Sequence, residues 1–264
     1  MDIRTDKDQI YASQNGRSLR WDVYKSAATA SKAPVVLIAH GGGWRFGERG
    51  MMASACTEYA RRGYVAIALE YRLLGEAKWP APLDDVKLAL QSVREQSDRL
   101  GVAREQVFLN GFSAGAHLCL LAASALSGAV AGVAAFFPPA RIGPEMGSML
   151  ELSGAAALAA VSPIEHVAGL PPTIVFCGDD DSLTPAQLSI DLYTAIRKAG
   201  GAADLRLYAE LGHEFVTLPG MLAQTVADAI SFFRRTAINK KSFDEANAAL
   251  REMWARMLAS GPPS

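Results

Sequence analysis

A serine lies between two glycines near the middle of the chain, in the motif GFSAG at residues 111–115. This G-x-S-x-G pattern is typical of a nucleophilic serine on a sharp turn between a strand and a helix. An apolar run precedes the motif and a helical run follows it, so the context predicts the same three parts in the same order. The backbone N–H of Ala114 would then lie at a helix N-terminus, where negative charge is stabilised.

A glycine run, HGGGW at residues 40–44, follows an earlier strand-like segment. Glycines let backbone N–H groups approach a ligand closely. The dinucleotide-binding pattern needs a glycine where Phe46 stands, and the P-loop pattern needs lysine where Glu48 stands. We therefore expect an oxyanion hole, with the N–H groups of Gly42 and Gly43 joining that of Ala114.

A serine nucleophile needs a base, and the chain offers four histidines. His213 follows the last strand-like run directly, where a loop could reach the serine, and it is the expected base. His117 falls inside the helix after the motif and is expected to pack there. His40 is expected to order the glycine loop, and His166 is the weaker alternative base.

The base in turn needs an acid that orients it. Three consecutive aspartates, residues 179–181, follow a strand-like run and precede a helix that starts at Pro185. Their chemistry alone does not separate them. The order serine, acid, histidine is that of the α/β-hydrolases and differs from the orders of chymotrypsin and subtilisin.

Short apolar runs alternate with longer amphipathic stretches along most of the chain. Strands are expected at residues 34–39, 64–69, 106–110, 131–137, 173–177 and 203–208, and helices at 83–100, 185–199 and 221–235. This alternation predicts β-α-β units, hence an α/β fold with a mostly parallel, doubly wound sheet covered on both faces. Asn15-Gly16 is a hairpin signal and predicts an antiparallel addition at the N-terminal edge.

Two segments depart from this alternation, within what we expect to be a single domain over residues 1–264. Residues 140–168 are expected to form a small cap-like insertion with a short helix, over the ligand crevice. Residues 236–264 are expected to form a helical tail that starts with a capping box at Ser242 and Glu245. Its apolar stripe, Leu250 to Leu258, is expected to pack on the body, with pairing to a second subunit as the alternative.

Composition excludes several classes of protein. The 264 residues are 50% hydrophobic, and 26 Lys and Arg face 27 Asp and Glu, for a net charge of −1. That balance leaves no electrostatic footprint for nucleic acid. No segment is expected to span a membrane, the N-terminus is too polar for a signal peptide, and a cytoplasmic protein is expected. The three cysteines form no C-x-x-C pair, and Cys119 and Cys177 are expected to be buried thiols.

Several motifs in order resemble the α/β-hydrolase esterases of the hormone-sensitive-lipase and acetyl-esterase type. They are HGGGW at 40–44, EYRL at 70–73, WPAPLDD at 79–85, GFSAG at 111–115, the acid loop at 178–185 and Gly212-His213. The resemblance covers residues 18–235 and lacks the long N-terminal cap of the lipase relatives. The family pattern G-x-x-D-x-x-x-P, laid on Gly178 and Pro185, selects Asp181 as the acid.

The resemblance therefore implies a catalytic triad of Ser113, Asp181 and His213 that hydrolyses carboxylic esters through an acyl-enzyme. It implies no metal and no cofactor. Trp44 and the insertion are expected to line the substrate pocket, and the compact insertion favours short-chain or small aromatic esters. An arylformamidase or other amidase with the same triad is the alternative. A non-catalytic small-molecule binding protein on the same fold is a more distant one.

Overall fold

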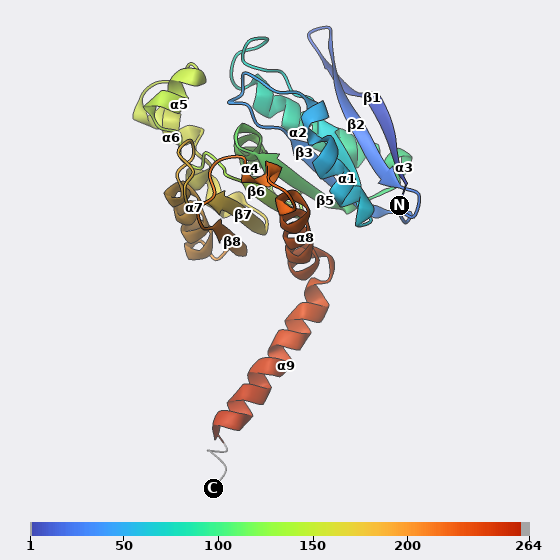
Figure 1. Ribbon diagram of the computed structural model, residues 1–264, viewed down its shortest axis with the longest axis vertical. Coiled ribbons are helices and arrows are strands. Elements are labelled where there is room, and N and C mark those ends of the chain that lie inside the picture. Colours follow the sequence, from blue (N-terminus) through green and yellow to red (C-terminus); the bar gives the residue numbers. More distant parts are fainter. Residues whose placement is uncertain (1, 260–264) are drawn as a thin grey trace.

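The computed structural model describes residues 2–259, and their strands form one eight-stranded sheet in the order β1-β2-β4-β3-β5-β6-β7-β8 (Figure 1). β1 pairs antiparallel with β2, and β2 with β4, whereas the remaining neighbours pair parallel. The predicted mostly parallel α/β sheet with an antiparallel hairpin is therefore confirmed. The strands are β1 (Ile3–Gln14), β2 (Arg17–Ser26), β3 (Ala33–Ala39), β4 (Val65–Leu69), β5 (Val102–Phe112), β6 (Gly132–Phe136), β7 (Thr173–Gly178) and β8 (Ala203–Tyr208).

Helices connect the parallel strands. The α-helices are α1 (Ala53–Arg61), α2 (Ala81–Glu95), α3 (Ser97–Leu100), α4 (Ala114–Ala125), α5 (Pro144–Met149), α6 (Ala155–Ala160), α7 (Ala186–Lys198), α8 (Met221–Phe233) and α9 (Lys240–Ala259). Three 3₁₀ segments, η1 (Arg49–Met52), η2 (Pro163–Gly169) and η3 (Phe215–Thr217), and a π-helical segment, η4 (Arg234–Ile238), complete the described elements.

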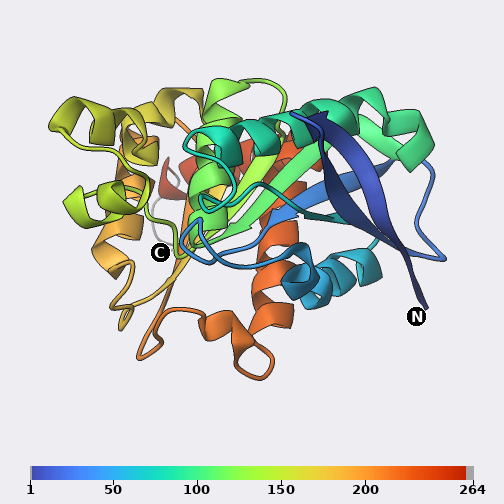
Figure 2. The same cartoon turned by 90° about the horizontal axis from the view of Figure 1, so that it is seen from above.

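The sheet separates two apolar cores because side chains alternate along each strand. In β3, Val35 and Leu37 face a core shared with α2, α4 and α7, whereas Val36 and Ile38 face a core shared with α1 and α8. Figure 2 shows α1 and α8 on one side of the sheet and α2 and α4 on the other. All three cysteines are buried, including Cys119 and Cys177 as predicted. Within residues 2–259, no helix is both long and apolar enough to cross a bilayer.

The N-terminal hairpin is longer than its turn signal alone indicated. β1 and β2 pair from Ile3 with Ser26 to Gln14 with Arg17, around the predicted Asn15-Gly16 turn. The register shifts twice, between Asp6 and Gln9 and between Ile10 and Ala12. Such bulges interrupt a ladder and increase its twist. Most residues of β1 are polar, and so the sequence pattern did not reveal its full length.

The insertion holds more structure than one short helix. α5 and α6 lie within residues 140–168, and η2 follows directly; the predicted helix corresponds to α6. Gly147 lets the two helices approach, since a Cβ there would lie 2.2 Å from Leu158 Cδ2. Figure 1 shows α5 and α6 together at one end of the sheet.

Two expectations about the tail are wrong. α9 begins at Lys240, so Ser242 lies inside the helix and caps nothing. No described residue of α9 is buried, and Figure 1 shows the helix extending away from the rest of the molecule. The stripe therefore does not pack on the body. Residues 1 and 260–264, the outer ends of the expected domain and tail, lie outside the described residues.

Candidate active site

Ser113 stands on a strained turn between β5 and α4. Its φ and ψ are 50° and −118°, a conformation that L-residues rarely adopt. The two glycines of the motif make this turn possible. A Cβ on Gly111 would lie 2.4 Å from the Gly115 carbonyl oxygen, and one on Gly115 would lie 2.3 Å from the Ala39 carbonyl oxygen. Both contacts are with backbone, so no side-chain movement could relieve them.

His213 reaches Ser113 from the loop after β8. Its Nε2 lies 3.1 Å from Ser113 Oγ, which is a hydrogen-bond distance for a nucleophile and its base. The Phe137 ring packs against the imidazole at 4.5 Å between centroids. His213 therefore contacts an aromatic ring and has one nitrogen at the serine.

Asp181 holds the other nitrogen of His213. Its Oδ2 accepts a hydrogen bond from His213 Nδ1 at 2.7 Å, which leaves Nε2 free to accept the Ser113 proton. Its Oδ1 accepts the backbone N–H groups of Leu183 and Thr184, at 2.9 and 2.8 Å. The Thr184 hydroxyl lies 2.9 Å from Oδ2.

The environment keeps Asp181 ionised. Burial alone would raise its pKa, but the hydrogen bonds from His213 and Thr184 outweigh burial, and the pKa lies below its ordinary value. The neighbouring aspartates play other parts. Asp179 accepts the backbone N–H of Glu210 at 2.6 Å, and Asp180 is exposed. Of the three consecutive carboxylates, Asp181 is the one that contacts the imidazole.

The glycine loop lies against the serine. A Cβ on Gly41 would come within 3.3 Å of Ser113 Cβ, and Gly42 has a φ of 113°. The N–H groups of Gly42 and Gly43 donate to no protein group among residues 2–259. Ala114 is the first residue of α4, so its N–H has no partner in the preceding turn of helix.

His40 holds the glycine loop in place through a hydrogen bond, as expected from its position before the glycines. Its Nδ1 donates to the Gly41 carbonyl at 2.7 Å, and the Tyr71 ring stacks on it at 4.3 Å. Burial lowers the pKa of His40, which favours the neutral form of the ring. Gly47 must lack a side chain, since a Cβ there would lie 2.4 Å from His40 Nδ1.

The other two histidines do not reach Ser113. His117 Nε2 donates to the Val161 carbonyl at 2.7 Å, which ties α4 to the end of the insertion. Burial lowers the pKa of His117 to about 4. His166 Nε2 donates to the Ala160 carbonyl at 2.9 Å, within the insertion itself. In the described part of the chain, no three or more His, Cys, Asp or Glu side chains could together hold a metal ion.

A cavity of about 610 Å³ opens beside Ser113. Its walls are mainly apolar and come from two segments, residues 46–55 and 214–222, with Phe112 and Phe137 at the base. Trp44 does not line it. The Trp44 side chain is 2% exposed and packs edge-on against His117. No residue of the insertion lines the cavity either; a Cβ on Gly43 would instead meet Met149 of the insertion, at 2.9 Å.

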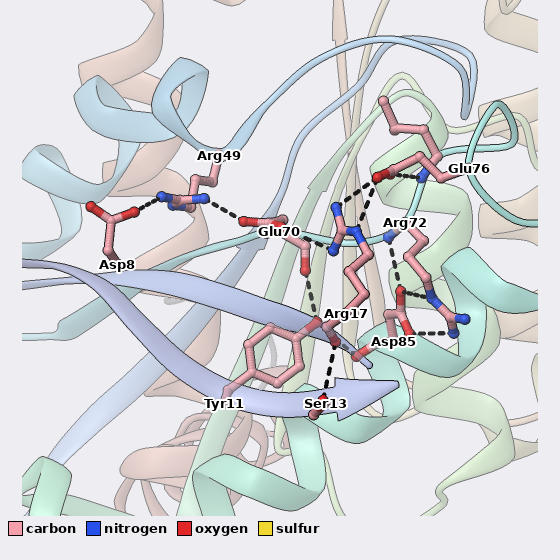
Figure 3. Close-up of polar contacts among 10 residues, drawn as sticks. Asp8, Tyr11, Ser13, Arg17, Arg49, Glu70, Arg72, Glu76 and Asp85 are labelled. Atoms are coloured by element: carbon pink, nitrogen blue, oxygen red, sulfur yellow. Dashed lines mark hydrogen bonds and ion pairs between the residues drawn. The ribbon is translucent and has the colours of Figure 1, made fainter. Parts of the chain in front are cut away.

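The sequence patterns missed the residues that hold the first wall in place. Arg49, at the start of η1, forms ion pairs with Asp8 and Glu70 (Figure 3) and with Asp22 at 3.0 Å. Arg17 adds pairs to Glu70 at 3.0 Å and to Glu76 at 2.9 Å. These pairs connect the N-terminal hairpin, the end of β4 and the segment at 46–52. These charged residues are far apart in the sequence and have no regular spacing. No sequence pattern could therefore have predicted the network.

A second buried pair fixes the strand end that follows β4. Asp85, in the first turns of α2, accepts hydrogen bonds from Nε and Nη2 of Arg72, at 2.8 and 2.7 Å (Figure 3). The Asp85 side chain is fully buried, and the pair raises the pKa of Arg72 further. Tyr11 of β1 donates to the Glu70 carbonyl at 2.7 Å. The EYRL and WPAPLDD motifs are thus joined by an ion pair, next to the glycine loop at residues 40–47.

Solved structures of an esterase superpose on this fold. Esterase 2 of Thermogutta terrifontis superposes with a TM-score of 0.77 at 25% identity, over 87% of this chain and 91% of that one. The chain has the α/β-hydrolase fold. A second structure of the same esterase, phosphorylated by paraoxon, superposes with a TM-score of 0.76 at 27% identity, over 87% and 93%.

Sequence relatives point the same way. Residues 21–131 match the BD-FAE family. Esterase LipQ of Mycobacterium tuberculosis is 28% identical over 251 residues, which is 83% of this chain but 59% of LipQ. The kynurenine formamidase of Danio rerio is 26% identical over 117 residues, or 44% of this chain and 38% of that enzyme. The chain thus spans less than two thirds of these curated relatives.

Proposed function

We propose that this α/β-hydrolase is a serine carboxylic-ester hydrolase. The proposal rests on the continuous chain of hydrogen bonds from Ser113 through His213 to Asp181. In it, His213 takes the Ser113 proton while Oγ attacks the ester carbonyl, and Asp181 stabilises the imidazolium. His213 returns the proton to the leaving alcohol, and an activated water then hydrolyses the acyl-enzyme.

The N–H groups of Gly42, Gly43 and Ala114 are proposed to stabilise the oxyanion. They are well suited to this because they donate to no acceptor within residues 2–259. Donors of this kind each lower a barrier by about 3 kcal/mol. Gly42 lines the cavity beside Ser113, so its N–H is the best placed of the loop donors.

The cavity suggests neutral esters with an apolar group of modest size. Its walls contain one charged residue among those described, Glu214, whose carboxylate disfavours anionic substrates. A volume of about 610 Å³ falls within the range of sites that bind small molecules. We therefore propose short-chain and small aromatic esters as substrates. Phe46 and Met51, rather than the insertion, would limit the size of the group that the cavity accepts.

The decisive test compares wild type with Ser113→Ala on p-nitrophenyl acetate and butyrate, with organophosphate titration alongside. We expect one label per wild-type chain, and loss of both label and activity in Ser113→Ala. A folded wild-type protein that neither hydrolyses these esters nor takes the label would overturn the proposal. It would favour a binding protein on the hydrolase fold.

An amidase remains the competing activity, since kynurenine formamidases are among the sequence relatives, with matches over 44% and 40% of this chain. The same triad serves ester and amide hydrolysis, so only rates separate the two. Measuring kcat/KM on N-formylkynurenine and on p-nitrophenyl butyrate decides the matter. We expect the ester to be preferred; a higher value on the formamide would assign the enzyme to the formamidases.

A further inference from the structure

α9 carries a row of exposed apolar side chains on one face. The row consists of Phe243, Leu250, Met253, Trp254, Met257 and Leu258, with exposed fractions from 41% to 81%. Their spacing of three, four and seven residues places them on a single stripe. Natural proteins rarely expose a continuous apolar stripe of this size unless another surface covers it.

The body of the same chain does not cover this stripe. α8, η4 and α9 follow one another with a single residue, Asn239, outside the helical segments. Hydrogen bonds run through this junction: Asn239 N–H donates to the Arg234 carbonyl at 2.7 Å, and Phe243 N–H to the Asn239 carbonyl at 3.2 Å. Folding α9 back onto the body would break the junction.

The polar face of α9 argues against a membrane surface. α9 carries four basic and three acidic residues, and six of them form i,i+4 pairs: Lys240 with Asp244, Lys241 with Glu245 and Glu252 with Arg256. Helices that lie on anionic membranes carry a predominantly basic polar face. A balanced, internally paired face is instead typical of a helix that packs against protein.

We propose that the stripe pairs with the same stripe of a second copy, antiparallel and about a two-fold axis. The six side chains present about 600 Å² per helix, taking roughly half of about 200 Å² for each. Two such faces would bury about 1,200 Å², which reaches the lower end of stable interfaces.

The position of a groove at the root of α9 favours the antiparallel arrangement. The groove has a volume of about 570 Å³ and is lined by Ile230, Arg234, Asn239 and Phe243, among others. Leu250 lies midway between Phe243 and Met257, so an antiparallel pair crosses at Leu250. The end of each helix then reaches the groove at the root of the other, and the two bodies lie at opposite ends.

The test is the mass of the full chain in solution, by light scattering after size exclusion and by sedimentation equilibrium. We expect a dimer for wild type, and a monomer for Leu250→Glu and Trp254→Glu, which place a charge in the stripe. Ala255→Glu adds the same charge outside the stripe and should remain dimeric. Unchanged organophosphate labelling of Ser113, or an unchanged circular dichroism spectrum, shows that each variant folds.

Cross-linking tests the orientation. With a short bis-maleimide, Leu250→Cys should yield a covalent dimer, whereas Phe243→Cys should not, because its counterpart lies at the far end of the pair. The three native cysteines are buried. A covalent dimer from Phe243→Cys would mean a parallel pair and overturn the orientation.

Two results would overturn the pairing itself. One is a wild-type chain that stays monomeric at high micromolar concentration. The other is a dimer that survives Leu250→Glu. Co-sedimentation of a monomeric wild type with phosphatidylcholine or phosphatidylglycerol vesicles would assign the stripe to a lipid surface instead.

Discussion

At the scale of single residues, His213 contacts Ser113 with one ring nitrogen and Asp181 with the other. The sequence identified Ser113 and His213 from their motifs, because each stands directly after a strand that ends at the same edge of the sheet. It did not separate the three aspartates by chemistry, and only a family pattern selected Asp181. The reason for the choice is the backbone: two N–H groups and the Thr184 hydroxyl fix the Asp181 carboxylate. The spacing Asp-x-x-Thr-Pro is a readable signal for that turn.

Replacing the acid tests this assignment with its neighbour as control. Asp181→Asn should lower kcat on p-nitrophenyl butyrate by about 10³-fold or more, because the imidazole loses its orientation and the stabilisation of its charged form. Asp180→Asn removes an exposed carboxylate one position away and should leave kcat unchanged. Equal losses in the two variants, or a loss confined to Asp180→Asn, would contradict the role given to Asp181.

At the scale of elements, Gly111 and Gly115 allow β3 and β5 to pack closely against the N-terminus of α4, the helix that follows the serine. The order of strands and the sharp turn at 111–115 were predicted, because apolar runs and glycines report directly on local backbone. The residues that form the walls of the cavity were not predicted. They come from segments brought together by the fold, and the expected contribution of Trp44 failed because that side chain turns into the core. The start of the tail helix was also misplaced: a π-helical segment links α8 to α9, and α9 begins at Lys240, before the expected cap at Ser242.

Gly115 gives a sharp test of this packing. Alanine normally stabilises a helix relative to glycine, by up to about 1 kcal/mol. Here the added Cβ would lie 2.3 and 2.4 Å from the carbonyl oxygens of Ala39 and His40. Gly115→Ala should therefore lower the free energy of unfolding by about 2 kcal/mol, as measured by urea denaturation.

Gly75→Ala is the matched control, since a Cβ there meets nothing within 4 Å. We expect its unfolding curve to match that of wild type. A Gly115→Ala protein as stable as wild type would show that β3 can move away from the turn, and the close packing described for the motif would then be wrong.

At the scale of the whole molecule, the stability of the fold depends on buried histidines whose rings must stay neutral. His117 joins α4 to the insertion and has a pKa of about 4, against an ordinary value near 6.5. Well above pH 6.5 the ring is neutral in both the folded and the unfolded state. Between pH 6.5 and 4 only the unfolded state does, so the stability contributed by the neutral ring is lost as pH falls.

The free energy of unfolding should therefore fall from pH 7 to pH 5, by about 2 kcal/mol on account of His117 alone. Buried His40 should add to the fall, since its pKa is lowered too. His117→Gln keeps an N–H donor but cannot titrate, so its urea midpoint should change less between the two pH values. His166→Gln, at a half-buried site, should show the wild-type change. A fall of equal size in His117→Gln would exclude His117 as its source.

The two register shifts in β1 have a consequence for how copies of the chain can associate. The outer strand of a sheet is a template onto which another chain can add, and this is a common origin of aggregation. Bulges at Asp6–Gln9 and Ile10–Ala12 break the template at one edge, and Lys7 and Asp8 lie within the first of them. At the other edge, β8 carries charged Asp204 and Arg206. Neither edge is suited to extending the sheet from one molecule to the next, so the fold directs contact between copies away from its strands and toward a helix.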